Sequence, residues 1–440
     1  MNEVTVIGAG LAGSEAAWQL AIRGIPVRLV EMKPKKMTPA HVSPFFAELV
    51  CSNSLRSDEL TNAVGLLKEE LRRMGSLIML CADAHRVAAG GALAVDREGF
   101  ARAVTEHIRF HPLIRVVEEE ITDFPDGDVI VATGPLTSDA FAETILRRTG
   151  SEGLHFYDAV APIVSLESVD MGSAFRASRY DKGTADYINC PMTEEEYTAF
   201  WRELISAREA AVHGFDDAGV FEGCMPVEVM ARRGVDTLRY GPMKPVGLRD
   251  PHTGKEAYAV VQLRQDNAEG TLFNLVGFQT HLAFPEQKRV FSMIPALRRA
   301  EFVRYGVMHR NTYLQSPGKL DRYYRLIEEP RIAFAGQITG VEGYVESCAS
   351  GMLCSLEMTA RLLGLPALDL SNETATGALS LYVSYGSIGD FQPMNVNFGI
   401  IAPLEQRVKG KRNKNAAVSA RSLAQIDELV KGELWQCVSL

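Results

Sequence analysis

The sequence has 440 residues, of which 46% are apolar and 23% charged, and its formal net charge is −9. This length is enough for two domains with large cores, and the scattered glycines and prolines exclude a collagen-like or low-complexity chain. The acidic balance argues against general nucleic-acid binding, so any such contact needs a local basic surface.

Apolar, β-branched residues at 4–7 predict a first strand, residues 14–23 have helical spacing, and 27–30 predict a second strand. This alternation indicates the opening of a parallel, doubly wound sheet. A further helical pattern covers 59–80, with Gly75 interrupting it, and residues 128–132 predict another buried strand.

The pattern changes between about 185 and 300, where short strand-like pieces alternate with glycine- and proline-marked turns and an acidic helix is expected near 194–211. The doubly wound pattern resumes at 331–336, and a long helix is expected at 343–363. We therefore predict an α/β protein, with a Rossmann-like nucleotide-binding domain in two parts and an inserted α+β domain. The expected limits are 1–185 and 301–440 for the two parts and 186–300 for the insertion.

The first turn carries the pattern Gly8-x-Gly10-x-x-Gly13, followed by Glu31 at the end of the second strand. The first glycine permits a tight turn, the second lets the backbone approach a pyrophosphate, and the third allows close packing of helix on strand. The phosphates are then held by the N-terminus of the helix, and Glu31 is placed to accept hydrogen bonds from ribose hydroxyls. A bound dinucleotide is favoured over a purely structural glycine turn.

Two later segments favour FAD over NAD. The strand at 129–132 ends in Thr133-Gly134, as in two-part flavoprotein folds, and a second glycine-rich turn contains Gly336, Gln337, Gly340 and Gly343. In such folds a late helix N-terminus faces the flavin pyrimidine edge and stabilises its reduced, anionic form. A simple NAD domain needs no such segment.

Several motifs resemble one family over nearly the whole chain, the folate- and FAD-dependent tRNA (uracil-5-)-methyltransferases called TrmFO. They are Glu48-Leu-Val-Cys-Ser-Asn-Ser-Leu-Arg56, Phe221-Glu-Gly-Cys-Met-Pro-Val-Glu228, Gly241-Pro-Met-Lys-Pro-Val-Gly-Leu248, Gly277-Phe-Gln-Thr-His-Leu282, Met308-His-Arg-Asn-Thr312 and Phe391-Gln-Pro-Met-Asn395. Cys348 departs from the resemblance, since a small residue such as alanine is expected there.

The resemblance implies FAD as cofactor, 5,10-methylenetetrahydrofolate as carbon donor, NAD(P)H as reductant, and methylation of the T-loop uridine at tRNA position 54 to ribothymidine. It further implies that reduced flavin carries the one-carbon unit and supplies the completing hydride. The alternatives are a small-molecule FAD oxidoreductase, an RNA-binding flavoprotein that works with a partner subunit, and the same chemistry on ribosomal RNA. The choice between NADH and NADPH and the oligomeric state stay open.

The seven cysteines form no C-x-x-C pair. The chain enters its first strand without a secretory signal, and no apolar stretch approaches the roughly 20 residues of a membrane span. We therefore expect a cytoplasmic protein with neither a disulfide framework nor a metal site, and with no membrane contact.

Methylation at C5 of uracil needs a thiolate that adds to C6, because C5 alone is a poor nucleophile. Cys224, between Gly223 and Pro226, is the preferred nucleophile, and the resemblance marks it too. Cys51 stands among polar residues and is a second candidate, as a base for the C5 proton or as an assistant at the flavin. A structural role is the alternative for both, and the other five cysteines are expected to be structural.

Folate has a flat pterin ring and an anionic glutamate tail. We therefore expect the protein to supply an aromatic or imidazole ring that stacks on the pterin and a cation that pairs with the tail. His309, Arg310 and Asn311 are candidates for this folate contact, and His281 is a rival for the stacking position.

The segment after Glu405 is free of acidic residues up to Asp427. It is basic on an acidic protein, so we expect either an RNA phosphate contact, whose affinity would fall steeply with salt, or a solvated tail. Arg298, Arg299, Arg304 and Arg310 are candidates to extend this surface. The RNA candidates are Arg407, Lys409, Lys411, Arg412 and Lys414, followed by Arg421.

Overall fold

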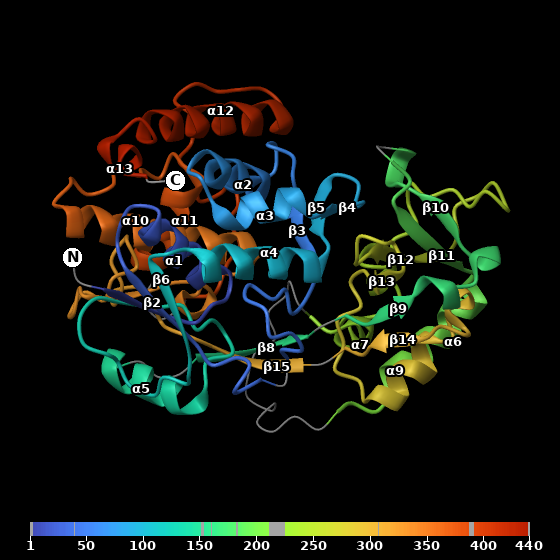
Figure 1. The fold of residues 1–440 in the computed structure, drawn as a ribbon. Helices are drawn as coiled ribbons and strands as arrows, with labels where there is room; N and C mark the ends of the chain where they lie inside the picture. The colour runs from blue at the N-terminus through green and yellow to red at the C-terminus, as the bar shows by residue number, and fades with distance from the viewer. Residues whose placement is uncertain are drawn as a thin grey trace.

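The computed structural model describes residues 3–38, 40–150, 154–159, 161–181, 184–210, 225–306, 308–386 and 391–438, with the backbone alone at 154–159, 181 and 308–312. Two bodies lie side by side in Figure 1, a larger one that holds both chain termini and a smaller one at the right.

The larger body is built on a five-stranded parallel sheet whose order is β16-β7-β1-β2-β6. The late strand β16 lies beside β7, so the two chain segments that flank the smaller body form one sheet. The doubly wound, two-part α/β prediction is thereby confirmed. The strands are β1 (Val4–Ile7), β2 (Val27–Glu31), β6 (Ile114–Glu118), β7 (Val129–Val131) and β16 (Ile332–Phe334).

Helices α1 (Leu11–Ala21) and α10 (Tyr344–Leu363) pack closely against each other beside this sheet (Figure 1). Glycine makes the approach possible, because a Cβ at Gly351 would lie 2.2 Å from the Ala12 carbonyl oxygen. Apolar side chains from these helices and from the sheet form one continuous core. The other helices of this body are α2 (Ala63–Arg73), α3 (Leu77–Ala84), α4 (Arg97–Phe110), α5 (Asp139–Thr149), α11 (Ala375–Tyr385), α12 (Lys411–Leu429) and α13 (Glu433–Gln436).

The helical pattern at 59–80 forms two helices, α2 and α3, where one interrupted helix was expected. Gly75 has φ +82°, a left-handed conformation that ends α2, and the Ser76 hydroxyl accepts from the Met79 N–H to begin α3. Leu60 is exposed and precedes α2, so it does not belong to the helix core. The long helix expected at 343–363 is α10, one residue shorter.

The smaller body contains a six-stranded sheet of order β10-β11-β12-β13-β9-β14, in which all neighbours are antiparallel. Helices α6 (Glu194–Ser206), α7 (Val227–Arg232) and α9 (Phe284–Phe291) contribute to its separate apolar core, and α8 spans Thr237–Tyr240. The strands are β9 (Ile163–Ser165), β10 (Phe175–Ala177), β11 (Tyr187–Met192), β12 (Ala259–Gln265), β13 (Leu272–Leu275) and β14 (Phe302–Arg304).

Two small sheets complete the fold. Strands β3 (Ser54–Ser57), β5 (Ala92–Val95) and β4 (Arg86–Val87) form an antiparallel sheet, and β8 (Leu154–Ala159) pairs with β15 (Met308–Tyr313) near the junction of the two bodies (Figure 1). Across the ranges given above, no helix combines the length and the apolar character that a bilayer crossing requires.

Candidate functional site

A cavity of about 410 Å³ opens at the carboxyl ends of strands β1, β2, β7 and β16. This edge of a parallel sheet is where doubly wound folds bind ligands. Seven of the nine residues expected to bind the cofactor line the cavity: Gly8, Gly10, Glu31, Gly134, Gly336, Gln337 and Gly343.

Each glycine of the first turn has a distinct packing environment. Gly8 has φ +96°, and a Cβ there would lie 2.6 Å from the Ala132 carbonyl oxygen. A Cβ at Gly13 would lie 1.8 Å from the carbonyl oxygen of Gly8, so this glycine is needed for the turn to pack on itself. At Gly10 a Cβ would meet no protein atom within 4 Å. Gly10 therefore faces open space, where the protein backbone can come close to a ligand.

Glu31 holds the shape of this turn. Its carboxylate accepts 2.7 Å and 2.9 Å hydrogen bonds from the backbone N–H groups of Ala9 and Lys33. The side chain is buried and lines the cavity. The contact of Glu31 with a ribose remains a prediction.

The second glycine turn leads into α10. Gly336, Gly340 and Gly343 all have positive φ, and a Cβ at Gly340 would lie 2.3 Å from the Phe391 ring. Gly340 thus packs beneath the turn, as Gly13 does at the first turn, while Gly343 lines the cavity. The amide of Gln337 donates 3.1 Å hydrogen bonds to both carboxylate oxygens of Glu342.

Both α1 and α10 begin at this cavity after a glycine, and neither has a side-chain cap. Backbone N–H groups at such helix ends favour anionic or electron-rich ligand groups. One end suits a pyrophosphate and the other the pyrimidine edge of a flavin, and the cavity volume lies in the usual range for ligand sites. The residues present therefore fit FAD.

Cys51 lies in the wall of this cavity and is half-buried. Its backbone N–H donates to the Tyr344 hydroxyl at 2.7 Å, and the Ser52 N–H donates to the same oxygen at 3.2 Å. Burial raises the pKa of Tyr344 well above its usual value, and the neighbouring Cys51 adds to the increase. The first residue of α10 therefore fixes the Cys51 backbone.

The smaller body also reaches this loop. Arg264 of β12 donates to the Ser52 hydroxyl at 2.7 Å and to the Asn53 side-chain oxygen at 3.2 Å. Asn53 in turn donates to the Gln265 carbonyl at 2.9 Å. Burial lowers the pKa of Arg264, a buried cation that lines the cavity. The Cys51 loop is thus held between the two bodies.

Cys224 lies outside the described residues. The chain after it is placed by Val227, whose N–H donates to the Gln279 carbonyl at 2.7 Å, and Gln279 lines the cavity. His309, Arg310 and Asn311 belong to β15, and their side chains also lie outside the described part.

Two residues have surroundings that differ from the sequence-based expectation. Cys348 is buried in a polar setting, with its sulfur 3.4 Å from a Glu15 carboxylate oxygen and 3.5 Å from the Ser76 hydroxyl, and burial raises the pKa of its thiol. His281 is buried between Glu209 and Glu228, whose carboxylates lie 3.3 Å and 3.4 Å from its ring nitrogens, and it is not in the cavity wall formed by the described residues.

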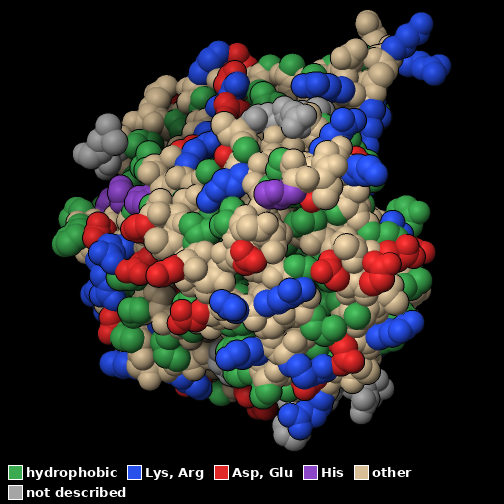
Figure 2. All heavy atoms as spheres, turned by 90° about the vertical axis from the view of Figure 1, so that its right-hand side faces the viewer, with side chains coloured by type: hydrophobic (Ala, Val, Ile, Leu, Met, Phe, Trp, Pro, Cys, Tyr) green, Lys and Arg blue, Asp and Glu red, His purple; other side chains and the backbone are tan. Residues whose placement is uncertain are grey.

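The five RNA candidates are all exposed, at the start of α12 and in the segment before it. Helix α12 lies along the top of the larger body in Figure 1, and Figure 2 shows Lys and Arg side chains gathered at the top of the molecule. Cations in the first turn oppose the helix dipole, so the fold gains nothing from them there. Arg298 and Arg299 lie between α9 and β14 in the smaller body and do not extend this surface.

Several cavity residues were not expected from the sequence. Arg56 stands inside one of the family motifs and Tyr344 directly follows the second glycine turn, but neither position indicates the partner of its side chain. Nothing in the local sequence predicts that Arg264 lines the cavity, because a charged residue in a strand usually faces solvent. The remaining unexpected polar residues of the cavity wall include Lys33, His41, Ser52 and Asn395.

A Rossmann-like fold in two parts, with two helix N-termini at one cavity, defines an FAD-binding protein. The model of the family "Glucose inhibited division protein A" matches residues 3–366. The chain belongs to this family and, within it, to the TrmFO proteins, as the following relatives show.

The chain is 60% identical over 431 residues to methylenetetrahydrofolate--tRNA-(uracil-5-)-methyltransferase TrmFO of Acetivibrio thermocellus, covering 98% of this chain and 99% of the relative. It is 58% identical over 434 residues to the protein of the same name from Desulfitobacterium hafniense, with 98% and 99% covered. A structure of Aquifex aeolicus GidA has a TM-score of 0.71 at 14% identity, covering 99% of this chain and 75% of that one, and supports the fold.

Proposed function

We propose that this chain transfers a one-carbon unit from 5,10-methylenetetrahydrofolate to C5 of a uridine in tRNA, with FAD as cofactor and NAD(P)H as reductant. The relatives that are 58–60% identical are named for this activity, and none of those names points to a small-molecule oxidoreductase. The observation that supports it most directly is the position of Cys51 in the wall of the cavity that fits FAD. The target is the T-loop uridine, and the reaction takes place in the cytoplasm.

Cys224 is the proposed nucleophile that adds to C6 of the uracil ring and makes C5 electron-rich. Its support is the family motif together with the hydrogen bond from Val227 to Gln279, which anchors the same segment at the cavity. When bound, FAD supplies the carrier and hydride chemistry of the methyl transfer. Cys51, whose backbone N–H donates to the Tyr344 hydroxyl, is proposed to accept the C5 proton or to assist at the cofactor.

The remaining roles concern binding. His309, Arg310 and Asn311 are proposed to hold the pterin and the glutamate tail of folate, because β15 lies near the junction of the two bodies. The exposed cations from Arg407 to Lys414 are proposed to contact tRNA phosphates. The target uridine must leave its stack to reach the cavity, so we expect the T-loop to open on binding.

The test uses undermodified tRNA, methylenetetrahydrofolate with a labelled methylene carbon, and NADPH or NADH. We expect labelled ribothymidine at the T-loop, mapped by nuclease digestion and mass spectrometry. Cys224→Ala should keep the flavin spectrum and lose methylation. The control is Cys437→Ala, which changes an exposed cysteine outside the cavity wall and should methylate normally.

Absence of methyl transfer by the wild-type protein with all substrates would overturn the proposed function. Full turnover by Cys224→Ala would leave the function intact and remove the nucleophile assignment. If the label appeared in ribosomal RNA and not in tRNA, ribosomal RNA would be the substrate instead of tRNA.

A further inference from the structure

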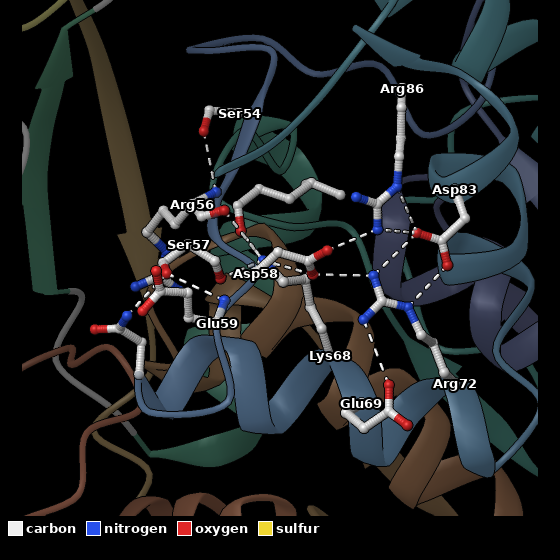
Figure 3. Close-up of polar contacts among 12 residues, drawn as sticks. Ser54, Arg56, Ser57, Asp58, Glu59, Lys68, Glu69, Arg72, Asp83 and Arg86 are labelled. Atoms are coloured by element: carbon white, nitrogen blue, oxygen red, sulfur yellow. Dashed lines mark hydrogen bonds and ion pairs between the residues drawn. The ribbon is translucent and has the colours of Figure 1, made fainter. Parts of the chain in front are cut away.

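A buried lysine lies behind the cavity wall, in the cluster of charged residues shown in Figure 3. Lys68 of α2 is fully buried, and its ammonium group donates hydrogen bonds of 2.9, 3.1 and 2.6 Å to the backbone carbonyls of Leu55, Arg56 and Ser57. Three consecutive carbonyls therefore converge on one cation. Such a contact fixes the path of the β3 segment rather than a single residue.

The outer side of this cluster is a network of ion pairs. Asp58 lies 3.7 Å from the Lys68 ammonium and accepts hydrogen bonds of 3.0 Å and 2.6 Å from Arg72 and Arg86. Asp83 bridges the same two arginines (Figure 3). Although burial opposes it, hydrogen bonds from Arg86 and Arg72 hold the pKa of Asp58 below its usual value. Asp58 thus stays ionised beside Lys68.

Arg56 adopts an unusual backbone conformation under this constraint. Its φ is +62°, in the left-handed region that residues with a Cβ rarely occupy. Strain of this kind persists only where surrounding contacts over-determine it, and it is typical of functional sites. Here the Lys68 contacts supply the constraint, and the conformation directs the Arg56 side chain to the cavity wall.

The Arg56 guanidinium pairs with Glu346 in the first turn of α10. One terminal nitrogen donates to both carboxylate oxygens of Glu346, which is fully buried and also accepts from the Val396 N–H at 3.0 Å. A Cβ on Gly343, the residue before α10, would lie 2.4 Å from a Glu346 oxygen and 3.0 Å from the same Arg56 nitrogen. The ion pair therefore packs directly against the helix end that opens on the cavity.

At the N-terminus of α10, the negative side chain of Glu346 pairs with the positive side chain of Arg56 from β3. A carboxylate in the first turn of a helix opposes the positive end of its dipole as a nearby ligand experiences it. A lone Glu346 would thus weaken the attraction of the α10 N-terminus for a negative ligand group. The Arg56 cation compensates that charge. Charge near the pyrimidine ring of a flavin is one of the means by which a protein sets its reduction potential.

We propose that Arg56, held in place by Lys68, is a charge-compensating residue that raises the reduction potential of bound FAD by neutralising Glu346 at the N-terminus of α10. The inference rests on the assignment of FAD to this cavity. Lys68 is a positioning residue that acts through Arg56.

The test is a spectroelectrochemical titration of the full-length, FAD-loaded protein and its variants. Arg56→Gln leaves Glu346 unpaired and should lower the ratio of affinities for reduced and oxidised FAD about tenfold, a shift of about 30 mV to more negative potential for a two-electron couple. Glu346→Gln leaves Arg56 unpaired and should shift the potential in the opposite direction. The double variant should return close to the wild-type value, as should Arg56→Lys.

Lys68→Met should shift the potential in the same direction as Arg56→Gln, because it releases the segment that carries Arg56. The matched control is Arg86→Gln, which removes a cation from the exposed side of the same network. Arg86 pairs with Asp58 and Asp83, not with Arg56 or Glu346. The potential of this variant should equal that of the wild type.

Shifts of the same sign in Arg56→Gln and Glu346→Gln, or unchanged potentials in both, would overturn the inference while leaving the FAD assignment intact. A wild-type protein that fails to retain FAD would instead overturn the assignment itself. If Arg56→Gln fails to fold, the difference in reduction potential between Glu346→Gln and the double variant gives the direction of the effect of the Arg56 charge.

Discussion

The backbone N–H of Cys51 donates a 2.7 Å hydrogen bond to the hydroxyl of Tyr344, 293 residues further along the chain. The contact joins a loop of the first chain segment to the first residue of α10 in the last one. The reactive-cysteine candidate and the helix end that fits a flavin are therefore fixed relative to each other by one hydroxyl group.

Tyr344→Phe should test this link. Removal of the hydroxyl leaves the N–H groups of Cys51 and Ser52 without this acceptor, and we expect the free energy of unfolding to fall by about 1–3 kcal/mol. Denaturant unfolding measures the stability, and the alkylation rate of Cys51 measures the loosening of its loop. Tyr240→Phe, at an exposed tyrosine, is the control. An alkylation rate equal to that of the wild type would contradict the link.

Alanine substitutions at Gly10 and Gly13 should separate binding from folding. Gly13→Ala places a Cβ against the Gly8 carbonyl oxygen and should destabilise the protein by at least about 1–3 kcal/mol. Gly10→Ala meets no protein atom and has an ordinary φ of −72°, so the stability of the apoprotein should change by less than about 0.5 kcal/mol. Its FAD affinity should still fall by about tenfold or more, because the glycine lets the backbone approach the pyrophosphate.

Thermal unfolding of the apoproteins and fluorescence titration with FAD measure the two effects. Unchanged FAD affinity in Gly10→Ala would show that the pyrophosphate does not pass this residue.

Acid should destabilise the protein through His41, another residue of the cavity wall. Burial, together with the charge of Lys33, lowers the pKa of His41 to about 4, whereas an unfolded histidine titrates near 6.5. The unfolded chain binds more protons between these values, so the free energy of unfolding falls as pH falls through this window. At pH 5 the expected loss from this residue is about 1–2 kcal/mol, with an allowance for partial solvent contact.

Denaturant unfolding at pH 7 and pH 5 measures this loss. His41→Gln should lose less stability than the wild type over this interval, and His252→Gln, at an exposed histidine, should behave as the wild type. Equal losses in all three proteins would remove His41 as the cause.

Salt should distinguish an RNA surface from a solvated helix end at α12. Replacement of Lys411, Arg412 and Lys414 by glutamine should weaken tRNA binding and reduce the slope of log affinity against log salt by about 2–3. Filter binding or fluorescence anisotropy at several salt concentrations measures the slope. Lys431→Gln, just beyond the other end of the helix, is the control. A slope that the triple substitution leaves unchanged would identify the segment as a solvated helix end.

The sequence determined those features that local patterns specify. Alternating apolar runs and glycine spacing predicted β1, β2, β7 and α10, because strand and helix periods and positive-φ positions are properties of neighbouring residues. Seven of the nine glycine-turn and acid residues expected at the cofactor do line the cavity, since parallel strands end at a common edge. The domain limits and the roles of Cys224 and His309 remain predictions.

Only the tertiary structure decided which residues meet around that edge. The Arg56–Glu346 pair and the Arg264–Ser52 contact join positions 290 and 212 residues apart, and no local pattern encodes such pairs. Packing also placed the Cys348 thiol beside Glu15 and buried His281 between two carboxylates. Sequence periodicity fixes the direction of a side chain from its own element, whereas its partner depends on how distant elements pack against one another.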